Sequence, residues 1–264
     1  MSAPCTPRLS FCMDDEIPPS DITLGAELGR GGLATVHAAD WLGMAVAAKL
    51  LHAPSPGATG LKAEDLLREA AMLASLRHPC ICAFYGVCHI GGNPVVVMER
   101  LECSVDQRIK DHSFHLSEPL CLQIAHEIAI GIAFLHRNNV IHRDIKAQNV
   151  MLDVAEHAKV CDFGLARSFY LGPGGRQEDT VNASSLWGSC QQVATSSGLG
   201  TLRYMAPEVI QRSEFSVKVR YNEAADTYSF GLLLWELAHR QTVFAEHTGV
   251  QVATKIAPSG QRPS

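Results

Sequence analysis

The stretch VIHRDIKAQNVMLD, from Val140 to Asp153, is the part of the sequence on which the interpretation depends. It collects charged and amide side chains between two apolar runs, namely His142, Arg143, Asp144, Lys146 and Asn149. A loop between two elements tolerates such groups as solvated surface residues, whereas a site that moves a charged group requires them. The stretch by itself leaves both interpretations open.

The bulk composition is that of a soluble globular protein with one large domain or two lobes. The 264 residues are 47% hydrophobic and 19% charged, which provides enough apolar side chains for a core. A net charge of −5 and a pI near 6.2 indicate no basic face, so we expect no nucleic acid partner.

The cysteines are scattered, and no CxxC pair or Cys/His finger spacing occurs among them, which predicts no zinc site. There are nine: Cys5, Cys12, Cys80, Cys82, Cys88, Cys103, Cys121, Cys161 and Cys190. An odd count without a secretory leader is typical of reduced thiols, and we expect a cytoplasmic protein.

The N-terminal residues 1–20 are rich in Pro and Ser without periodicity, which predicts a flexible leader. They lack the basic and apolar regions of a signal peptide, and Ser2 does not fit a myristoylation signal. The apolar patch FGLLLWELA near the C-terminus is too short to cross a bilayer, so we expect no membrane span.

From Asp21 the pattern changes to short apolar runs interrupted by glycine, which predicts three strands up to Leu51. A helix is expected over Glu64–His78, with Pro79 just beyond its end. Two further strands, CAFYGVC and PVVVME, follow it. Residues 21–100 are therefore expected to form a small, mostly antiparallel sheet with one helix.

Beyond residue 101 the periodicity is helical. Apolar residues recur at a spacing of three or four up to His136, at Leu120, Ile124, Ile128, Ile132 and Leu135, and predict a long core helix. A second helix is expected over Asp226–Ala238. The Gly-, Ser- and Thr-rich residues 168–200 exceed normal connector length. The expected fold class is α+β.

Three glycines, Gly29, Gly31 and Gly32, lie in the turn of LGRGGLATV. They would let backbone N–H groups approach phosphate oxygens, although the pattern alone favours a plain tight hairpin. Lys49 ends the next strand, where a lone lysine is usually a snorkelling surface residue. Glu69 shares a helix face with leucines, and such a carboxylate is destabilising unless paired, so a Lys49–Glu69 ion pair is one expectation.

The segment KVCDFGLAR places Asp162, Phe163 and Gly164 after a short strand. A strand-ending turn would explain this triplet taken alone. However, the glycine loop, Lys49, Glu69, HRDxKxxN, DFG and YMAPE (Tyr204–Glu208) all occur, in that order. This conjunction is too specific to arise by chance.

With these motifs the sequence resembles the eukaryotic protein kinase family from Asp21 to the C-terminus. The resemblance implies a bilobal fold, with an N-lobe at 21–100 and a C-lobe at 101–264. It implies that HRDIKAQN is a catalytic loop that serves phosphoryl transfer from Mg-ATP to a protein substrate.

By this resemblance each charged residue receives a role. Asp144 accepts the proton of the acceptor hydroxyl, and Lys146 contacts the γ-phosphate. Asn149 and Asp162 hold Mg²⁺. Lys49, positioned by Glu69, binds the α- and β-phosphates.

The same resemblance predicts the ATP-binding surface. Its residues would be Leu28, Gly29, Gly31 and Gly32 over the phosphates, Val36, Ala47 and Met151 around adenine, Met98 as gatekeeper, and Glu99 to Leu101 as backbone hydrogen-bonding residues. Cys161 would line the site, either as a reactive thiol or as a buried inert one.

The motifs also resemble a substrate class. Lys146 in HRDIKAQN and the segment GTLRYMAPE resemble the corresponding motifs of serine/threonine kinases. By this resemblance Thr201 would bridge Asp144 and Lys146. The segments LRHPCICAFYGVC and DTYSFGLLLWEL are similar to the tyrosine-kinase-like (TKL) group, whose members phosphorylate mostly Ser and Thr.

Regulation by an upstream kinase is a further expectation of the resemblance. Arg143 would receive a phosphate carried by Thr195, Ser196 or Ser197. The alternative is that this Ser- and Thr-rich segment carries no such site.

The sequence departs from the family pattern in three places. Ala34 replaces the third glycine. The chain stops at GQRPS, so Glu208 would lack its usual arginine and an apolar face of the C-lobe would be uncovered. A fragment, a partner chain that covers this lobe, or low stability would each account for this. The long segment 162–208 contains an insertion, expected to be disordered, although Trp187 could anchor a docking element.

The expected activity is therefore that of an intracellular signalling serine/threonine kinase. The alternative is a catalytically weak or inactive pseudokinase-like scaffold that binds nucleotide. A small-molecule kinase of similar fold is disfavoured by the APE region.

Overall fold

The computed structural model describes residues 16–31, 34–51, 70, 72–163, 167–168, 171–172, 175–176, 180–182, 201–209, 218–220 and 222–263. The chain divides into two compact units, the first comprising Met1–Arg77 and Ala83–Arg100 and the second His78–Cys82 and Leu101–Ser264. The segment His78–Cys82 belongs to the second unit because it pairs with Val160 there. The N–H of Cys82 donates to the Val160 carbonyl at 3.0 Å, and the N–H of Val160 donates to the Cys80 carbonyl at 2.9 Å.

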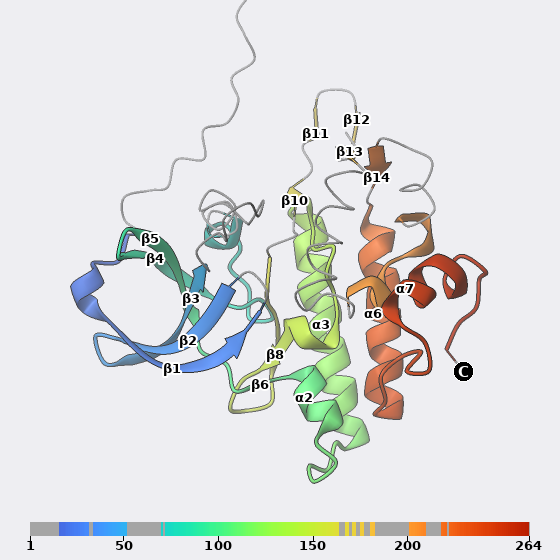
Figure 1. Ribbon diagram of the computed structural model, residues 1–264, viewed down its shortest axis with the longest axis horizontal. Coiled ribbons are helices and arrows are strands. Elements are labelled where there is room, and N and C mark those ends of the chain that lie inside the picture. The colour runs from blue at the N-terminus through green and yellow to red at the C-terminus, as the bar shows by residue number, and fades with distance from the viewer. Residues whose placement is uncertain are drawn as a thin grey trace, which may run out of the picture. The chain divides into compact units, whose positions relative to one another are not determined.

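The first unit contains an antiparallel five-stranded sheet in the order β1-β2-β3-β5-β4 (Figure 1). A short 3₁₀ turn, η2 (Pro19–Asp21), precedes β1 (Ile22–Arg30), β2 (Ala34–Trp41), β3 (Met44–Leu51), β4 (Phe84–Ile90) and β5 (Asn93–Glu99). The β2–β3 turn has two residues at positive φ, Leu42 at 51° and Gly43 at 89°. Asp40 Oδ1 accepts the Gly43 N–H at 2.8 Å and closes this turn.

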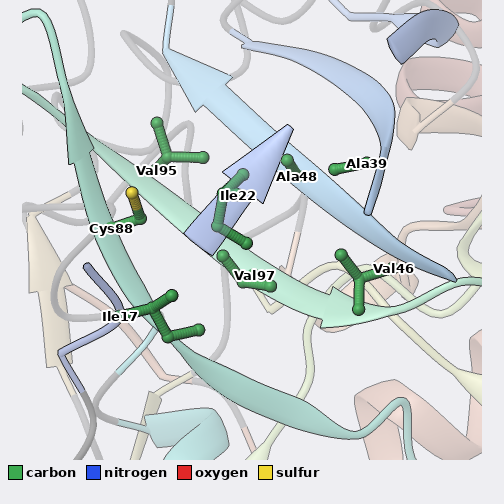
Figure 2. Packing of buried hydrophobic residues seen from close by; sticks show 8 residues of the cluster. All are labelled: Ile17, Ile22, Ala39, Val46, Ala48, Cys88, Val95 and Val97. Carbon is green, nitrogen blue, oxygen red and sulfur yellow. The ribbon is translucent and has the colours of Figure 1, made fainter. Parts of the chain in front are cut away.

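Alternation along the strands gives this sheet two apolar faces. Figure 2 shows the first, formed by Ile17, Ile22, Ala39, Val46, Ala48, Cys88, Val95 and Val97. The opposite face packs Val87 and Val96 against Ala70, with Phe84 and Met98 beside them. Ala70 lies in the predicted helix, of which residues 64–69 and 71 lie outside the described residues.

The second unit is mainly helical. Its helices are α2 (Val105–Lys110), α3 (Glu118–Arg137), α6 (Glu223–His239) and α7 (Gly249–Gln251), with shorter turns η3 (Ala147–Asn149), η4 (Thr201–Tyr204) and η5 (Val252–Ile256). A small sheet joins β6 (Cys103–Ser104), β8 (Val150–Leu152) and β9 (Ala158–Val160). The remaining short strands are β7 (Val140–Ile141), β10 (Arg167–Ser168), β11 (Leu171–Gly172), β12 (Gly175–Arg176), β13 (Thr180–Asn182) and β14 (Lys218–Arg220).

Helix α3 forms where the sequence periodicity predicts a core helix. Its N-cap is Ser117, whose hydroxyl accepts the Leu120 N–H at 3.4 Å, and it buries Ile124, Ile128 and Leu135 completely. Of the described helices, α3 alone is long and apolar enough to cross a membrane by length and composition. The core helix of a globular domain passes the same test, and the buried face of α3 is of that kind.

Helices α3 and α6 run side by side (Figure 1). The thiol of Cys121 lies 3.8 Å from the Leu237 carbonyl near one end of the pair, and His136 Nε2 lies 2.9 Å from Asp226 Oδ2 near the other. Leu232 on α6 packs with Tyr204, Val243, Phe244 and Val252, so that η4, the loop after α6 and η5 share one apolar cluster.

Candidate active site

The charged loop of the opening stretch lies between β7 and β8, where η3 returns the chain to the small sheet. Its centre is Asp144, which is 9% exposed. Lys146 Nζ lies 2.7 Å from Asp144 Oδ2. Asn149 Nδ2 donates to the same oxygen and to the Asp144 carbonyl, both at 2.8 Å. The structure thus brings three of the predicted catalytic and metal-binding residues together around one carboxylate.

The electrostatics of this cluster set two effects against each other. Burial raises the pKa of the Asp144 carboxyl, because desolvation disfavours the charged form. The Lys146 ammonium opposes this shift through charge and a hydrogen bond. Lys146 is therefore the group that favours the ionised, proton-accepting form of Asp144.

Asp226, which was not among the predicted site residues, anchors the backbone of the loop that carries Asp144. This carboxylate is 1% exposed in α6 and accepts the backbone N–H groups of His142 at 2.9 Å and Arg143 at 2.8 Å. Arg143 has φ of 70°, a left-handed conformation that is unfavourable for a non-glycine residue. Two bonds to a buried charge stabilise the backbone where it is strained. The available sequence signal was a carboxylate in a helix rich in apolar residues.

His142 connects this loop to the DFG segment. It is fully buried. Its ring packs edge-on against the Phe163 ring, with 4.9 Å between the two ring centroids. Its Nδ1 accepts the Asp144 N–H at 3.3 Å, which assigns the ring proton to Nε2, 3.0 Å from the Cys161 carbonyl. Cys161, the residue before Asp162, is therefore hydrogen-bonded to His142, which lies two residues before Asp144.

The predicted metal-binding residues suit Mg²⁺ in their donor chemistry, since Mg²⁺ prefers oxygen ligands. Asp162 is exposed and has φ of 61°. Asn149 uses its Nδ2 on Asp144, which orients the amide oxygen as its candidate metal ligand. Among the residues that the structure describes, no group of three His, Cys, Asp or Glu side chains could hold a metal. Mg²⁺ commonly binds to one or two protein groups together with substrate phosphates.

In the first unit, strand register places several predicted nucleotide-binding residues in one row. Gly29 pairs with Val36, Val36 with Lys49, and Lys49 with Val96. Paired residues project to the same face of a sheet, so Lys49 lies on the face opposite the cluster of Figure 2. At Gly29 no described atom lies within 4 Å of the position that a Cβ would take. Among the described residues, the space beside Gly29 is therefore unfilled.

The other predicted adenine-binding residues lie in both units. Ala47 pairs with Met98 across β3 and β5, and by strand alternation both share the face of Lys49. The Glu99 N–H donates to the Ala83 carbonyl at 2.8 Å. The backbone carbonyl of Glu99 is therefore the candidate nucleotide-binding group of Glu99. Leu28 is 47% exposed. In the second unit, Leu101 and Met151 are half-buried.

Several predicted site residues lie outside the described residues. These are Gly32, Glu69, Gly164, Trp187, Thr195, Ser196 and Ser197. Thr201 lies in η4, where its backbone is described. The proposed Lys49–Glu69 pair and the phosphate-accepting role of Arg143 therefore stay predictions.

A second network that the sequence analysis missed supports the YMAPE segment. The hydroxyl of Tyr204 donates to Glu236 Oε2, and Glu236 Oε1 accepts the Val243 N–H at 2.9 Å. Arg203 donates to the carbonyls of Val243, at 2.8 Å, and His247, at 2.9 Å. Burial raises the pKa of both Tyr204 and Glu236. Adjacent residues of η4 thus anchor the loop after α6.

A family model of the protein kinase domain matches residues 22–261, and the chain belongs to this family. The chain is 34% identical over 235 residues to the dual specificity protein kinase shkC of Dictyostelium discoideum, covering 88% of the chain and 42% of the relative. It is also 34% identical over 248 residues to the serine/threonine-protein kinase CTR1 of Arabidopsis thaliana, covering 92% of the chain and 27% of that relative.

The probable serine/threonine-protein kinase drkD of Dictyostelium discoideum is 34% identical over 245 residues, covering 91% of this chain and 17% of its own length. The chain thus spans less than half of each of these relatives. The family match confirms the predicted fold class and the predicted protein kinase domain. The names of drkD and CTR1 agree with the predicted serine/threonine class. ATP and Mg²⁺ are the reactants that kinases of this family use in general.

Proposed function

We propose that this chain transfers the γ-phosphate of Mg-ATP to Ser and Thr hydroxyls of protein substrates, as a member of the tyrosine-kinase-like group. The observation that carries this proposal is the cluster of Lys146 and Asn149 around the Asp144 carboxylate, at 2.7 and 2.8 Å. A nucleotide-binding scaffold has no chemical need for this arrangement. Similarity to relatives named as serine/threonine kinases supports the acceptor class.

In this proposal Asp144 orients the acceptor hydroxyl and takes its proton as the oxygen attacks. Lys146 keeps the carboxylate ionised and places positive charge beside the transferred phosphoryl group. Mg²⁺, held by Asn149 and Asp162, would neutralise negative charge on the phosphates. Asp226 acts through His142 and Arg143, whose backbone it holds, and is a positioning residue.

The roles assigned to the first unit are proposals as well. Lys49, with Glu69 as its partner, binds the α- and β-phosphates. Gly29, Gly31 and Gly32 form the turn over the phosphates, where their lack of side chains permits close approach of the backbone. The surface of Val36 and Ala47 receives the adenine ring, with Met98 as the gatekeeper residue.

We propose in addition that the protein is cytoplasmic and is controlled by an upstream kinase. Support for the location comes from the scattered cysteines, of which the six in the described residues form no disulfide. Support for control comes from Arg143, which lies directly beside Asp144 in the sequence. A phosphate on Thr195, Ser196 or Ser197 is the proposed partner of that arginine.

The test compares wild type with Asp144→Asn in a reaction with Mg²⁺, labelled ATP and a basic protein substrate. We expect wild type to form phosphoserine or phosphothreonine, and the variant to be slower by roughly 10²- to 10⁴-fold, the usual contribution of a general base. The matched control is Asp40→Asn, which makes the same chemical change in a surface turn and should keep full activity.

Two outcomes contradict the proposal. If wild type shows no turnover while ATP still raises its melting temperature, the chain is a nucleotide-binding scaffold. If phosphotyrosine is the main product, the acceptor class is wrong, although phosphoryl transfer is retained.

A further inference from the structure

Two cysteines that the proposed reaction does not use are neighbours on adjacent backbone segments. Ile81 forms a parallel bridge with Val160, and hydrogen bonds of 3.0 and 2.9 Å flank that bridge. Cys82 and Cys161 are the next residue on each segment, so they project together to the opposite side. Adjacent strands lie about 4.8 Å apart, within the range of Cα separations of roughly 4.4 to 6.8 Å that a disulfide requires.

The two thiols are in contact. Cys161 is hydrogen-bonded to the Cys82 side chain, and this contact, followed by burial, raises the pKa of the Cys161 thiol. The Cys161 Sγ also lies 3.4 Å from the Lys159 carbonyl. Cys82 is only 4% exposed, whereas Cys161 is partly exposed. Of the two residues, Cys161 is thus the more accessible to a small solute.

We propose that Cys82 and Cys161 form a paired-thiol modification site that peroxides oxidise to a disulfide. In the first step hydrogen peroxide transfers one oxygen to Cys161, which gives a sulfenic acid and one water. In the second step the Cys82 sulfur attacks the Cys161 sulfur, the S–O bond breaks, and the hydroxyl leaves as water with the Cys82 proton. Two thiols and one peroxide thus give one disulfide and two waters.

Proximity favours the second step over further oxidation. Both thiols are largely shielded from solvent, which slows the initial attack by peroxide. Once the sulfenic acid exists, the neighbouring thiol is already in contact, so ring closure proceeds as an intramolecular reaction. The expected product is therefore a disulfide rather than a sulfinic acid.

The bond would form at a position tied to the catalytic loop. The Cys161 N–H donates to the Asn149 carbonyl at 2.8 Å, and the Cys161 carbonyl lies 3.0 Å from His142 Nε2. A cross-link to Cys82 adds a third attachment to this residue. The backbone of Cys161 in the modification site is therefore hydrogen-bonded directly to the loop around Asp144.

The chain contains a matched control thiol. Cys80 lies two residues from Cys82 and is also buried, at 8% exposure. Burial raises the pKa of its thiol, as do the charges of Glu127. Cys80→Ser thus removes a buried thiol from the same segment without removing either member of the proposed pair.

The experiment treats the full chain with hydrogen peroxide, blocks remaining thiols by alkylation and maps peptides by mass spectrometry. We expect one cross-linked peptide that contains Cys82 and Cys161, lighter by two hydrogens and restored by dithiothreitol. Cys80→Ser should form the same cross-link at the wild-type rate. Cys82→Ser should instead gain one or more oxygen atoms on Cys161.

The proposal is overturned if both thiols of oxidised wild type are alkylated separately, or if Cys161 carries oxygen while Cys82 remains a thiol. It is also overturned if Cys80 enters disulfides as often as Cys82 does. If Cys82→Ser does not fold, the wild-type map and the Cys80→Ser control still decide between these outcomes. None of these readouts depends on kinase activity.

Discussion

Asp226 is the residue whose replacement tests how the catalytic loop is held. In Asp226→Asn one carboxylate oxygen becomes an NH₂ group, so the N–H of either His142 or Arg143 loses its acceptor. Hydrogen bonds to a charged group contribute about 1.5–3 kcal/mol each. We therefore expect the free energy of unfolding to fall by about 2–3 kcal/mol, with a loss of phosphoryl transfer, measured by urea denaturation and an activity assay.

The control for this change is Asp40→Asn, where the carboxylate accepts a single N–H from Gly43 at the surface. It should change the free energy of unfolding by less than about 1 kcal/mol. Equal losses in the two variants would contradict the holding role assigned to Asp226.

The buried carboxyl of Glu236 should make the stability of the folded protein depend on pH. Burial raises its folded-state pKa above the ordinary 4.5, while the bonds from Tyr204 and Val243 oppose the shift. Because the folded pKa is raised, the stability linked to this group is fully present below the unfolded pKa and is lost as pH rises through the folded pKa. Glu236→Gln carries no titrating group, so its melting temperature should fall less than that of wild type when pH is raised from about 4.

The comparison uses melting temperatures at successive pH values for wild type, Glu236→Gln and Glu246→Gln. Glu246 lies nearby with its side chain 66% exposed, and its replacement should leave the wild-type profile unchanged. Parallel profiles for wild type and Glu236→Gln would show that Glu236 does not carry the effect.

At the scale of single residues, the sequence predicted site residues that lie close together along the chain. Asp144, Lys146 and Asn149 form one motif, and the structure places them around one carboxylate. Asp226, Tyr204 and the Cys82–Cys161 contact were not predicted as partners, because their roles depend on backbone groups or thiols far away in sequence. A carboxylate in a helix rich in apolar residues indicates a buried acceptor without identifying its donors.

At the scale of elements, two helical glycines provide a matched pair of substitutions. A Cβ on Gly131 of α3 would lie 2.9 Å from the Cys80 carbonyl, whereas at Gly231 of α6 no described atom lies within 4 Å. Gly131→Ala should therefore lower the free energy of unfolding by about 1–2 kcal/mol through overpacking. Gly231→Ala should raise it by up to about 1 kcal/mol, because alanine favours a helix.

Urea denaturation of both variants measures the two effects on one scale. A stabilising effect of Gly131→Ala would mean that α3 and the segment around Cys80 are not in close contact. A destabilising effect of Gly231→Ala would mean that this face of α6 is covered.

Element positions were largely predictable, because periodicity is a local property. The strands before and after the first helix and the core helix α3 lie where apolar spacing predicted them. The assignment of His78–Cys82 to the second unit was not predictable, since it depends on pairing with Val160. A segment of five residues is too short for its apolar periodicity to indicate which sheet it will join.

At the scale of the whole chain, each unit has its own apolar core. Val46 in the first unit and Leu233 in the second are both fully buried. Val46→Ala should cost roughly 1–3 kcal/mol and should speed amide exchange in β1 to β5 more than in α3 and α6. Leu233→Ala should have the reverse effect, with a cost of roughly 2–5 kcal/mol.

Native-state hydrogen exchange, read peptide by peptide, checks this prediction. Equal acceleration in both units for either variant would indicate one cooperative core. The alanine variants serve as controls for each other, since each removes apolar volume from one unit only.

The bonds from Asp226 to His142 and Arg143 span 84 and 83 residues of sequence. A ribosome adding about 5–20 residues per second would complete α6 roughly 4–17 s after the catalytic loop has been made. Contacts of such sequence separation form late, because a long loop must close first. A nascent chain that already contains every residue of HRDIKAQN therefore still lacks the carboxylate that orders them. We therefore expect the backbone of this loop to become ordered only after synthesis has passed Asp226.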